Sequence, residues 1–125
     1  MPLIPTTLVT SRLASTRESF IASQINSSIS TAVLAEGLPT GVDPFDQLIQ
    51  TGSLHVIRIA PGCPCCAGQL TMRVNLNRLL RLQPQRILIS LSSSGHMDQI
   101  RLLLSSLPYD SLISLTEVIS ADDPC

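Results

Sequence analysis

Short runs of β-branched and aliphatic residues alternate along this chain with longer stretches of helical period. The runs have the length of buried strands, and the stretches place aliphatic side chains three and four residues apart. The alternation predicts strands at Thr6–Thr10, Thr31–Ala35, Leu54–Ala60, Arg86–Leu91 and Leu112–Ser120. It predicts helices at Arg17–Ser28, after Asp43, at Gln69–Leu82 and at Asp98–Leu107. We therefore expect one three-layer α/β domain over residues 1–125, with a mostly parallel sheet of about five strands.

Details of two helices are also predicted. Ser15 or Thr16 is a natural N-cap for the first helix. After Asp43, the second helix is expected to turn Phe45, Leu48 and Ile49 toward the core.

Parallel α/β sheets bind ligands at the carboxyl ends of their strands. Four predicted loops meet at that edge of the sheet: Ser11–Thr16, Glu36–Asp43, Pro61–Gly68 and Ser92–His96. We expect the functional residues to lie in these loops.

Composition argues against several classes of function. The net charge is −1 and only 2% of residues are aromatic, so nucleic-acid binding is not expected. No run approaches the roughly 18 apolar residues of a membrane span, and the first ten residues do not resemble a signal peptide. We expect a cytoplasmic protein without a membrane partner. Four cysteines in such a chain favour metal or redox chemistry over disulfides.

Three of the four cysteines fall within four positions, as Cys63, Cys65 and Cys66, in one of the predicted strand-end loops. Thiolates bind Zn²⁺ tetrahedrally, so three of them leave one position for water, a partner's group or another side chain of this chain. Glu36 and His96 are the candidate further ligands, because their loops lie at the same edge. Zinc is the expected metal, with Co²⁺ and Cu⁺ as alternatives.

Simpler interpretations of these residues stay open. The cysteines are also compatible with packing as small apolar side chains. His96 fits an ordinary surface position, and Glu36 fits a helix cap or a solvated acid. His55 lies near the start of its strand, at the opposite end of the sheet, and is a poor ligand candidate.

The segment Gly62-Cys63-Pro64-Cys65-Cys66 resembles the Gly-Cys-x-Cys-Cys loop of the CobW family of P-loop GTPases, relatives of the UreG and HypB metallochaperones. Further matches occur in the family's order: Ile4-Pro5 before the first strand, Gly41-Val42-Asp43 after the second, and Ile87-Leu88-Ile89 before a loop ending in Gly95-His96. The resemblance covers nearly the whole chain. It implies a P-loop NTPase-like fold and a role in handling metal ions.

The phosphate loop departs from that family. Where members carry Gly-x-x-Gly-x-Gly-Lys-Thr-Thr, this chain has Ser11-Arg12-Leu13-Ala14-Ser15-Thr16-Arg17-Glu18-Ser19. Ser11, Ala14 and Thr16 replace glycines that let the backbone approach phosphates closely. Arg17 stands in place of the Lys, and Glu18 replaces the Mg²⁺-binding Thr, where its carboxylate would repel phosphate. We expect no cofactor to bind this run, and Arg17 to anchor its helix or a neighbouring carboxylate instead.

The second nucleotide element has changed as well. Ser90 replaces an acidic residue of the family, and Ser93 replaces a glycine. The chain contains no Lys, so it cannot supply the family's guanine-reading Asn-Lys-x-Asp. Neither GTP binding nor GTP hydrolysis is therefore expected.

The leading hypothesis is a non-hydrolytic CobW-like pseudo-GTPase that binds a transition metal through Cys63, Cys65 and Cys66. It would act as an accessory or regulatory protein of metal homeostasis, with an intact CobW-type GTPase or a second copy of itself as partner. One alternative is an enzyme, a GTP-binding metallochaperone with residual activity in which Arg17 replaces the Lys. Another is a structural or interaction protein that has lost both sites.

Overall fold

The computed structural model describes residues 3–26, 28–37, 43–50, 52, 54–59, 70–92 and 97–120, without the side chains of Gln47, Met97 and Glu117. The chain alternates strands with helices, as its sequence pattern predicts. The strands are β1 (Ile4–Thr10), β2 (Thr31–Glu36), β3 (Leu54–Ile59), β4 (Arg86–Leu91) and β5 (Ile113–Ser120). The helices are α1 (Ala14–Gln24), α2 (Asp46–Gln50), α3 (Leu70–Arg81) and α4 (Met97–Leu104), followed by the 3₁₀ turn η4 (Tyr109–Ser111).

The described strands form one five-stranded sheet in the order β3-β2-β4-β1-β5, and every neighbouring pair is parallel. Parallel neighbours require a crossover between them, and the helices supply these crossovers. The single α/β domain and the mostly parallel sheet of about five strands, both expected from the sequence, are confirmed.

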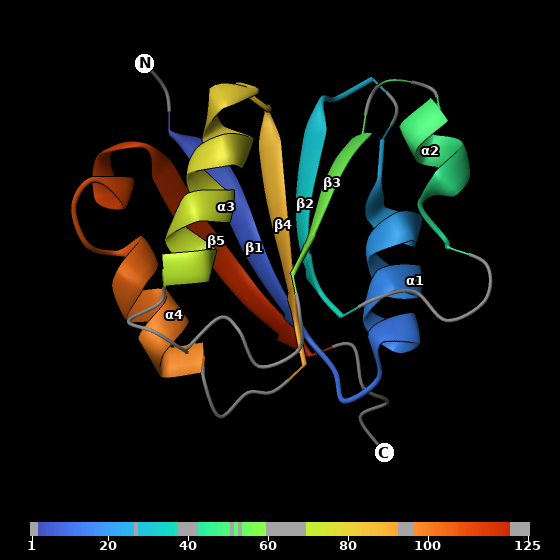
Figure 1. Cartoon of the computed structure of the whole chain (residues 1–125), viewed down its shortest axis with the longest axis horizontal. Coiled ribbons are helices and arrows are strands. Elements are labelled where there is room, and N and C mark those ends of the chain that lie inside the picture. The colour runs from blue at the N-terminus through green and yellow to red at the C-terminus, as the bar shows by residue number, and fades with distance from the viewer. Residues whose placement is uncertain are drawn as a thin grey trace.

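Helices cover both faces of the sheet, so the domain has three layers (Figure 1). On one face, α3 and α4 pack against β1, β2 and β4 through a large aliphatic cluster that includes Leu8, Met72, Leu76 and Ile100. On the other face, α1 and the segment before α2 pack through a smaller cluster centred on Val9, Ile21, Val33, Phe45 and Leu88. Both faces are buried because aliphatic residues dominate the inner strands.

The ends of several elements differ from the sequence expectation. The first helix begins at Ala14 rather than Arg17, so Ser15 and Thr16 lie inside it, and Leu13 at the N-cap makes no side-chain capping bond. Instead, the Ser11 hydroxyl accepts a hydrogen bond from the Leu13 N–H at 3.3 Å. The inward position predicted for Ile49 is also wrong, since this side chain is 41% exposed while Phe45 is fully buried.

None of the described helices is long and apolar enough to cross a membrane. All five strands run in the same direction, so their carboxyl ends meet at one edge of the sheet. The start of α1 lies at this edge, directly after β1 (Figure 1).

Candidate functional site at the carboxyl ends of the strands

The N-terminal part of α1 carries two buried charged residues, Arg17 and Glu18, which are 1% and 2% exposed. They lie in the run that stands where the resembling family has its phosphate loop. Charged residues are rarely this buried unless they are paired or fully hydrogen-bonded. Their partners therefore define what this edge of the sheet can do.

Arg17 links the ends of three strands through hydrogen bonds from its guanidinium group. Nη1 donates to the Ser11 carbonyl after β1 at 2.7 Å, and Nη2 donates to the Glu36 carbonyl at the end of β2 at 2.7 Å. Nε donates to the Ser90 hydroxyl on β4 at 2.8 Å. These bonds confirm that Arg17 anchors its helix to the strand ends, the first of the two roles expected for it.

Glu18 forms a bidentate ion pair with Arg58 of β3. The Arg58 Nη1 lies 2.8 Å from Oε2 of Glu18, and Nη2 lies 2.9 Å from Oε1. Nη2 also donates to Oδ2 of Asp43 at 2.8 Å, and the guanidinium lies 5.8 Å from the centroid of the Phe45 ring. Its hydrogen bond with Glu18 raises the pKa of Arg58 above its ordinary value, against the opposing effect of burial.

The cluster of Arg58, Glu18 and Asp43 joins β3, α1 and the segment before α2. A fork-shaped guanidinium matches a carboxylate in this bidentate geometry, and the pairing compensates the burial of Glu18. Glu18, which the sequence resemblance aligns with a Mg²⁺-binding Thr, is therefore engaged with Arg58.

The Glu36 carboxylate connects the end of β2 to the end of β4. Its Oε1 accepts hydrogen bonds from the Ser92 N–H at 2.6 Å and from the Ser92 hydroxyl at 2.7 Å. Glu36 is 3% exposed. This rules out the interpretation of Glu36 as a solvated acid. Ligation of a metal by Oε1 would compete with the two bonds from Ser92.

Replacing Glu36 by alanine is expected to lower the free energy of unfolding by about 1 to 3 kcal/mol, because the Ser92 N–H loses its acceptor. Glu36→Gln keeps a carbonyl oxygen at this place and is expected to cost less. Urea unfolding of both variants measures the difference. Equal losses for the two would contradict the assignment of Oε1 as the acceptor of the Ser92 bonds.

Of the predicted metal ligands, Glu36 lies within the described residues, at the expected edge of the sheet. Cys63, Cys65, Cys66 and His96 lie outside the described residues. Within the described ranges, no group of three or more His, Cys, Asp or Glu side chains is arranged to hold a metal ion. His55 is exposed on β3, away from the carboxyl ends of the strands, as expected.

The sequence analysis missed Arg58 and its ion pairs with Glu18 and Asp43. A signal was present, since Arg58 interrupts the apolar run of β3 between Ile57 and Ile59. A charge inside a strand of this kind usually has a buried partner. The two partners, Glu18 and Asp43, lie 40 and 15 residues away and could not be identified from the residues next to Arg58.

Comparison with curated proteins finds a zinc chaperone. The chain is 40% identical over 78 residues to the zinc chaperone YeiR of Escherichia coli (strain K12). The matched part covers 62% of this chain and 24% of YeiR, so the chain spans about a quarter of the length of that relative. No family model matches the chain, and no solved structure matches it. The similarity to a zinc chaperone agrees with the resemblance to a family related to metallochaperones.

Proposed function

We propose that this chain is a CobW-like protein that binds a transition metal, zinc foremost, without hydrolysing GTP. The observation that carries the proposal is the 40% identity over 78 residues to a zinc chaperone. The chain itself supplies three cysteines within four positions, a chemistry suited to zinc. Cys63, Cys65 and Cys66 are the proposed ligands, and Glu36 and His96 are candidates for a fourth.

The buried charges of α1 support the absence of GTP hydrolysis. Arg17, in place of the phosphate-binding Lys, donates hydrogen bonds to Ser11, Glu36 and Ser90 of its own chain. Glu18, in place of the Mg²⁺-binding Thr, is paired with Arg58. A nucleotide would have to displace these internal bonds and tolerate a carboxylate near its phosphates, and both cost free energy.

The proposed role is that of an accessory or regulatory protein of metal homeostasis in the cytoplasm. Its partners are the metal ion and either an intact CobW-type GTPase or a second copy of the chain. In this role the metal is a cargo or a regulatory ligand, since the described part of the fold is held together by its own aliphatic clusters and ion pairs.

Metal content tests the proposal. The chain is purified under reducing conditions without added metal, and its metals are measured by inductively coupled plasma mass spectrometry. We expect about one zinc per chain in the wild type and little in Cys65→Ser/Cys66→Ser, because two of three thiolates are lost. The matched control is Cys125→Ser, a cysteine outside the cluster, which is expected to keep its zinc.

Two outcomes would contradict the proposal. One is a wild-type chain that carries no zinc and does not take it up on titration. The other is equal zinc content in the wild type and in Cys65→Ser/Cys66→Ser, which would place the metal elsewhere.

A further inference from the structure

The described sheet has two edge strands, β3 and β5, each paired with a neighbour on one side. The outer side of an edge strand presents a row of backbone N–H and C=O groups that can pair with another chain. Native proteins usually prevent such pairing with a bulge, a proline or a charged side chain in the edge strand. The two edges of this sheet differ in this respect.

The β5 edge carries a bulge. The register with β1 shifts between Thr6, which lies opposite Leu115, and Thr7, which lies opposite Glu117. Thr116 is the extra residue, and its hydroxyl donates to the Thr6 carbonyl at 3.1 Å. A bulge of this kind twists the strand and interrupts a regular edge.

Among its described residues, the β3 edge has neither a bulge nor a proline that would prevent pairing with another chain. All six residues from Leu54 to Ile59 pair in unbroken register with β2, and none is proline. Its one permanent charge, Arg58, is held by Glu18 and Asp43 at 2.8 Å each. That charge is directed to partners on its own chain and does not protect the edge.

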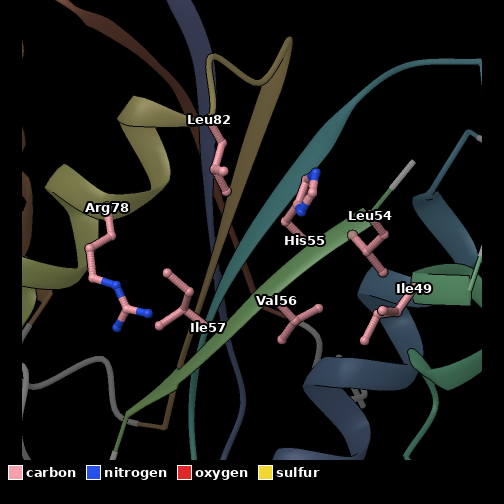
Figure 2. Close-up of a pocket in the computed structure, with 7 residues that line it drawn as sticks. All are labelled: Ile49, Leu54, His55, Val56, Ile57, Arg78 and Leu82. Atoms are coloured by element: carbon pink, nitrogen blue, oxygen red, sulfur yellow. The ribbon is translucent and has the colours of Figure 1, made fainter. Parts of the chain in front are cut away.

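A groove of about 330 Å³ follows the β3 strand, and five of the side chains that line it are aliphatic, beside His55 and Arg78. Figure 2 shows Leu54, Val56 and Ile49 on the side of β3 toward α1 and α2, and Ile57 and His55 on the side toward α3. Aliphatic side chains thus flank the strand on both faces. They include Ile49 and Leu82, which are 41% and 47% exposed.

The backbone groups that face outward follow from the pairing with β2. The Ile59 carbonyl accepts the Gly37 N–H at 2.8 Å, so Ile59 directs its backbone groups toward β2. Backbone direction alternates along a strand that pairs with a parallel neighbour. Leu54, Val56 and Arg58 therefore direct their N–H and C=O groups toward the outer edge.

We propose that the β3 edge binds the β3 edge of a second copy of this chain, in an antiparallel arrangement about a two-fold axis through Val56. Val56 then lies opposite the partner's Val56, and Leu54 lies opposite the partner's Arg58. Opposed residues of an antiparallel pair exchange both backbone hydrogen bonds when their groups face each other. This register satisfies every outward N–H and C=O group of Leu54, Val56 and Arg58.

The self-complementary register is the reason a second copy fits this edge. The same three residues on each copy supply and accept all the bonds, which is the requirement of a closed two-fold interface. Opposed residues share a face of the sheet, so Val56 meets an aliphatic partner and His55 meets the partner's Ile57. The net charge of −1 gives little repulsion between copies. Arg78, the permanently charged residue of the groove, is exposed and hydrogen-bonded to Asn75, so it can remain in water.

Sedimentation equilibrium of the full chain, with reductant and chelator present to exclude disulfide and metal bridges, tests the proposal. From about 5 to 200 µM, we expect the mass to approach twice the 13.4 kDa of the chain. Val56→Pro is expected to stay monomeric, because it removes an outward N–H that the fold of one copy does not use. Val118→Lys, at the exposed β5 edge, is the matched control and is expected to dimerise like the wild type.

Amide hydrogen exchange on the wild-type chain tests the register itself. The amides of Leu54, Val56 and Arg58 are expected to exchange about tenfold or more slowly at high than at low concentration. A monomer at every concentration would overturn the proposal, as would a dimer that persists in folded Val56→Pro or is lost in Val118→Lys. Unchanged exchange at these three amides in a dimer would also overturn it. None of these outcomes bears on metal content, so the proposed function is tested separately.

Discussion

Replacing Arg17 by alanine is expected to lower the free energy of unfolding by about 3 to 5 kcal/mol. The guanidinium group is 1% exposed and connects the ends of β1, β2 and β4 through the Ser11 carbonyl, the Glu36 carbonyl and the Ser90 hydroxyl. Alanine leaves these buried acceptors without their donor and leaves a cavity where the side chain lay. Since whole domains are stable by about 5 to 15 kcal/mol, the loss is large.

Urea unfolding of three variants measures this effect. Arg17→Lys keeps the charge but not the planar fork, so it is expected to fall between the wild type and Arg17→Ala. Arg12→Ala, an exposed arginine five residues earlier, is the matched control and is expected to change stability by about 0.5 kcal/mol or less. If Arg17→Ala cost no more than Arg12→Ala, Arg17 would not be the structural link between the strand ends.

Replacing Arg58 by methionine is expected to cost a similar amount, about 3 to 5 kcal/mol, for a different reason. Glu18 is 2% exposed, and without Arg58 its carboxylate remains buried without the cation that compensates it. Glu18→Gln alone is expected to lower the free energy of unfolding by less. Arg58 is more exposed to water than Glu18, and it still forms its ion pair with Asp43. Once Glu18 is neutral, the loss of Arg58 matters less.

A double-mutant cycle separates this ion pair from simple loss of packing. Arg58→Met/Glu18→Gln is expected to be more stable than the sum of the single losses predicts, by about 1 to 3 kcal/mol. Arg101→Met, an exposed arginine of α4, is the control and is expected to have an effect of about 0.5 kcal/mol or less. Additive losses in the cycle would mean that Glu18 and Arg58 do not stabilise each other.

These two residues also show where prediction from the sequence ended. The strands and α3 could be predicted from the spacing of their aliphatic residues. Met72, Leu76 and Leu79 of α3 are buried, as that spacing indicates. The buried face of α1 carries Arg17 and Glu18 beside Ile21. Because two of these three residues are charged, the hydrophobic pattern describes this helix poorly, and the start predicted from the sequence is wrong. The partners Ser90 and Arg58 lie 73 and 40 residues away, beyond any local pattern.

The candidate site was predicted in part. Because parallel strands end at one edge, the loop positions of Ser11, Glu36 and Ser92 could be anticipated from the element order alone. The bonds between them depend on side-chain reach across the sheet, which strand order does not determine. The cysteines and His96 stay predictions of the sequence, because they lie outside the described residues.

The internal bonds of Arg17 and Glu18 give the proposed function a consequence for regulation. A GTPase-coupled chaperone would change its metal affinity when nucleotide binds, since coupling between two sites is reciprocal. In this chain the side chains of Arg17 and Glu18, which the resemblance places at the phosphate and Mg²⁺ positions, are engaged with their own fold. Metal binding should therefore be independent of GTP.

Zinc titration in the presence and absence of Mg²⁺ and GTP tests metal binding and its independence of nucleotide together. A chromophoric chelator competes with the chain for zinc, and the zinc affinity is compared with and without millimolar GTP. We predict about one zinc per chain, with an affinity that GTP changes by about twofold or less. A chain that binds no zinc, or a zinc affinity that GTP shifts by about tenfold or more, would contradict the proposed function.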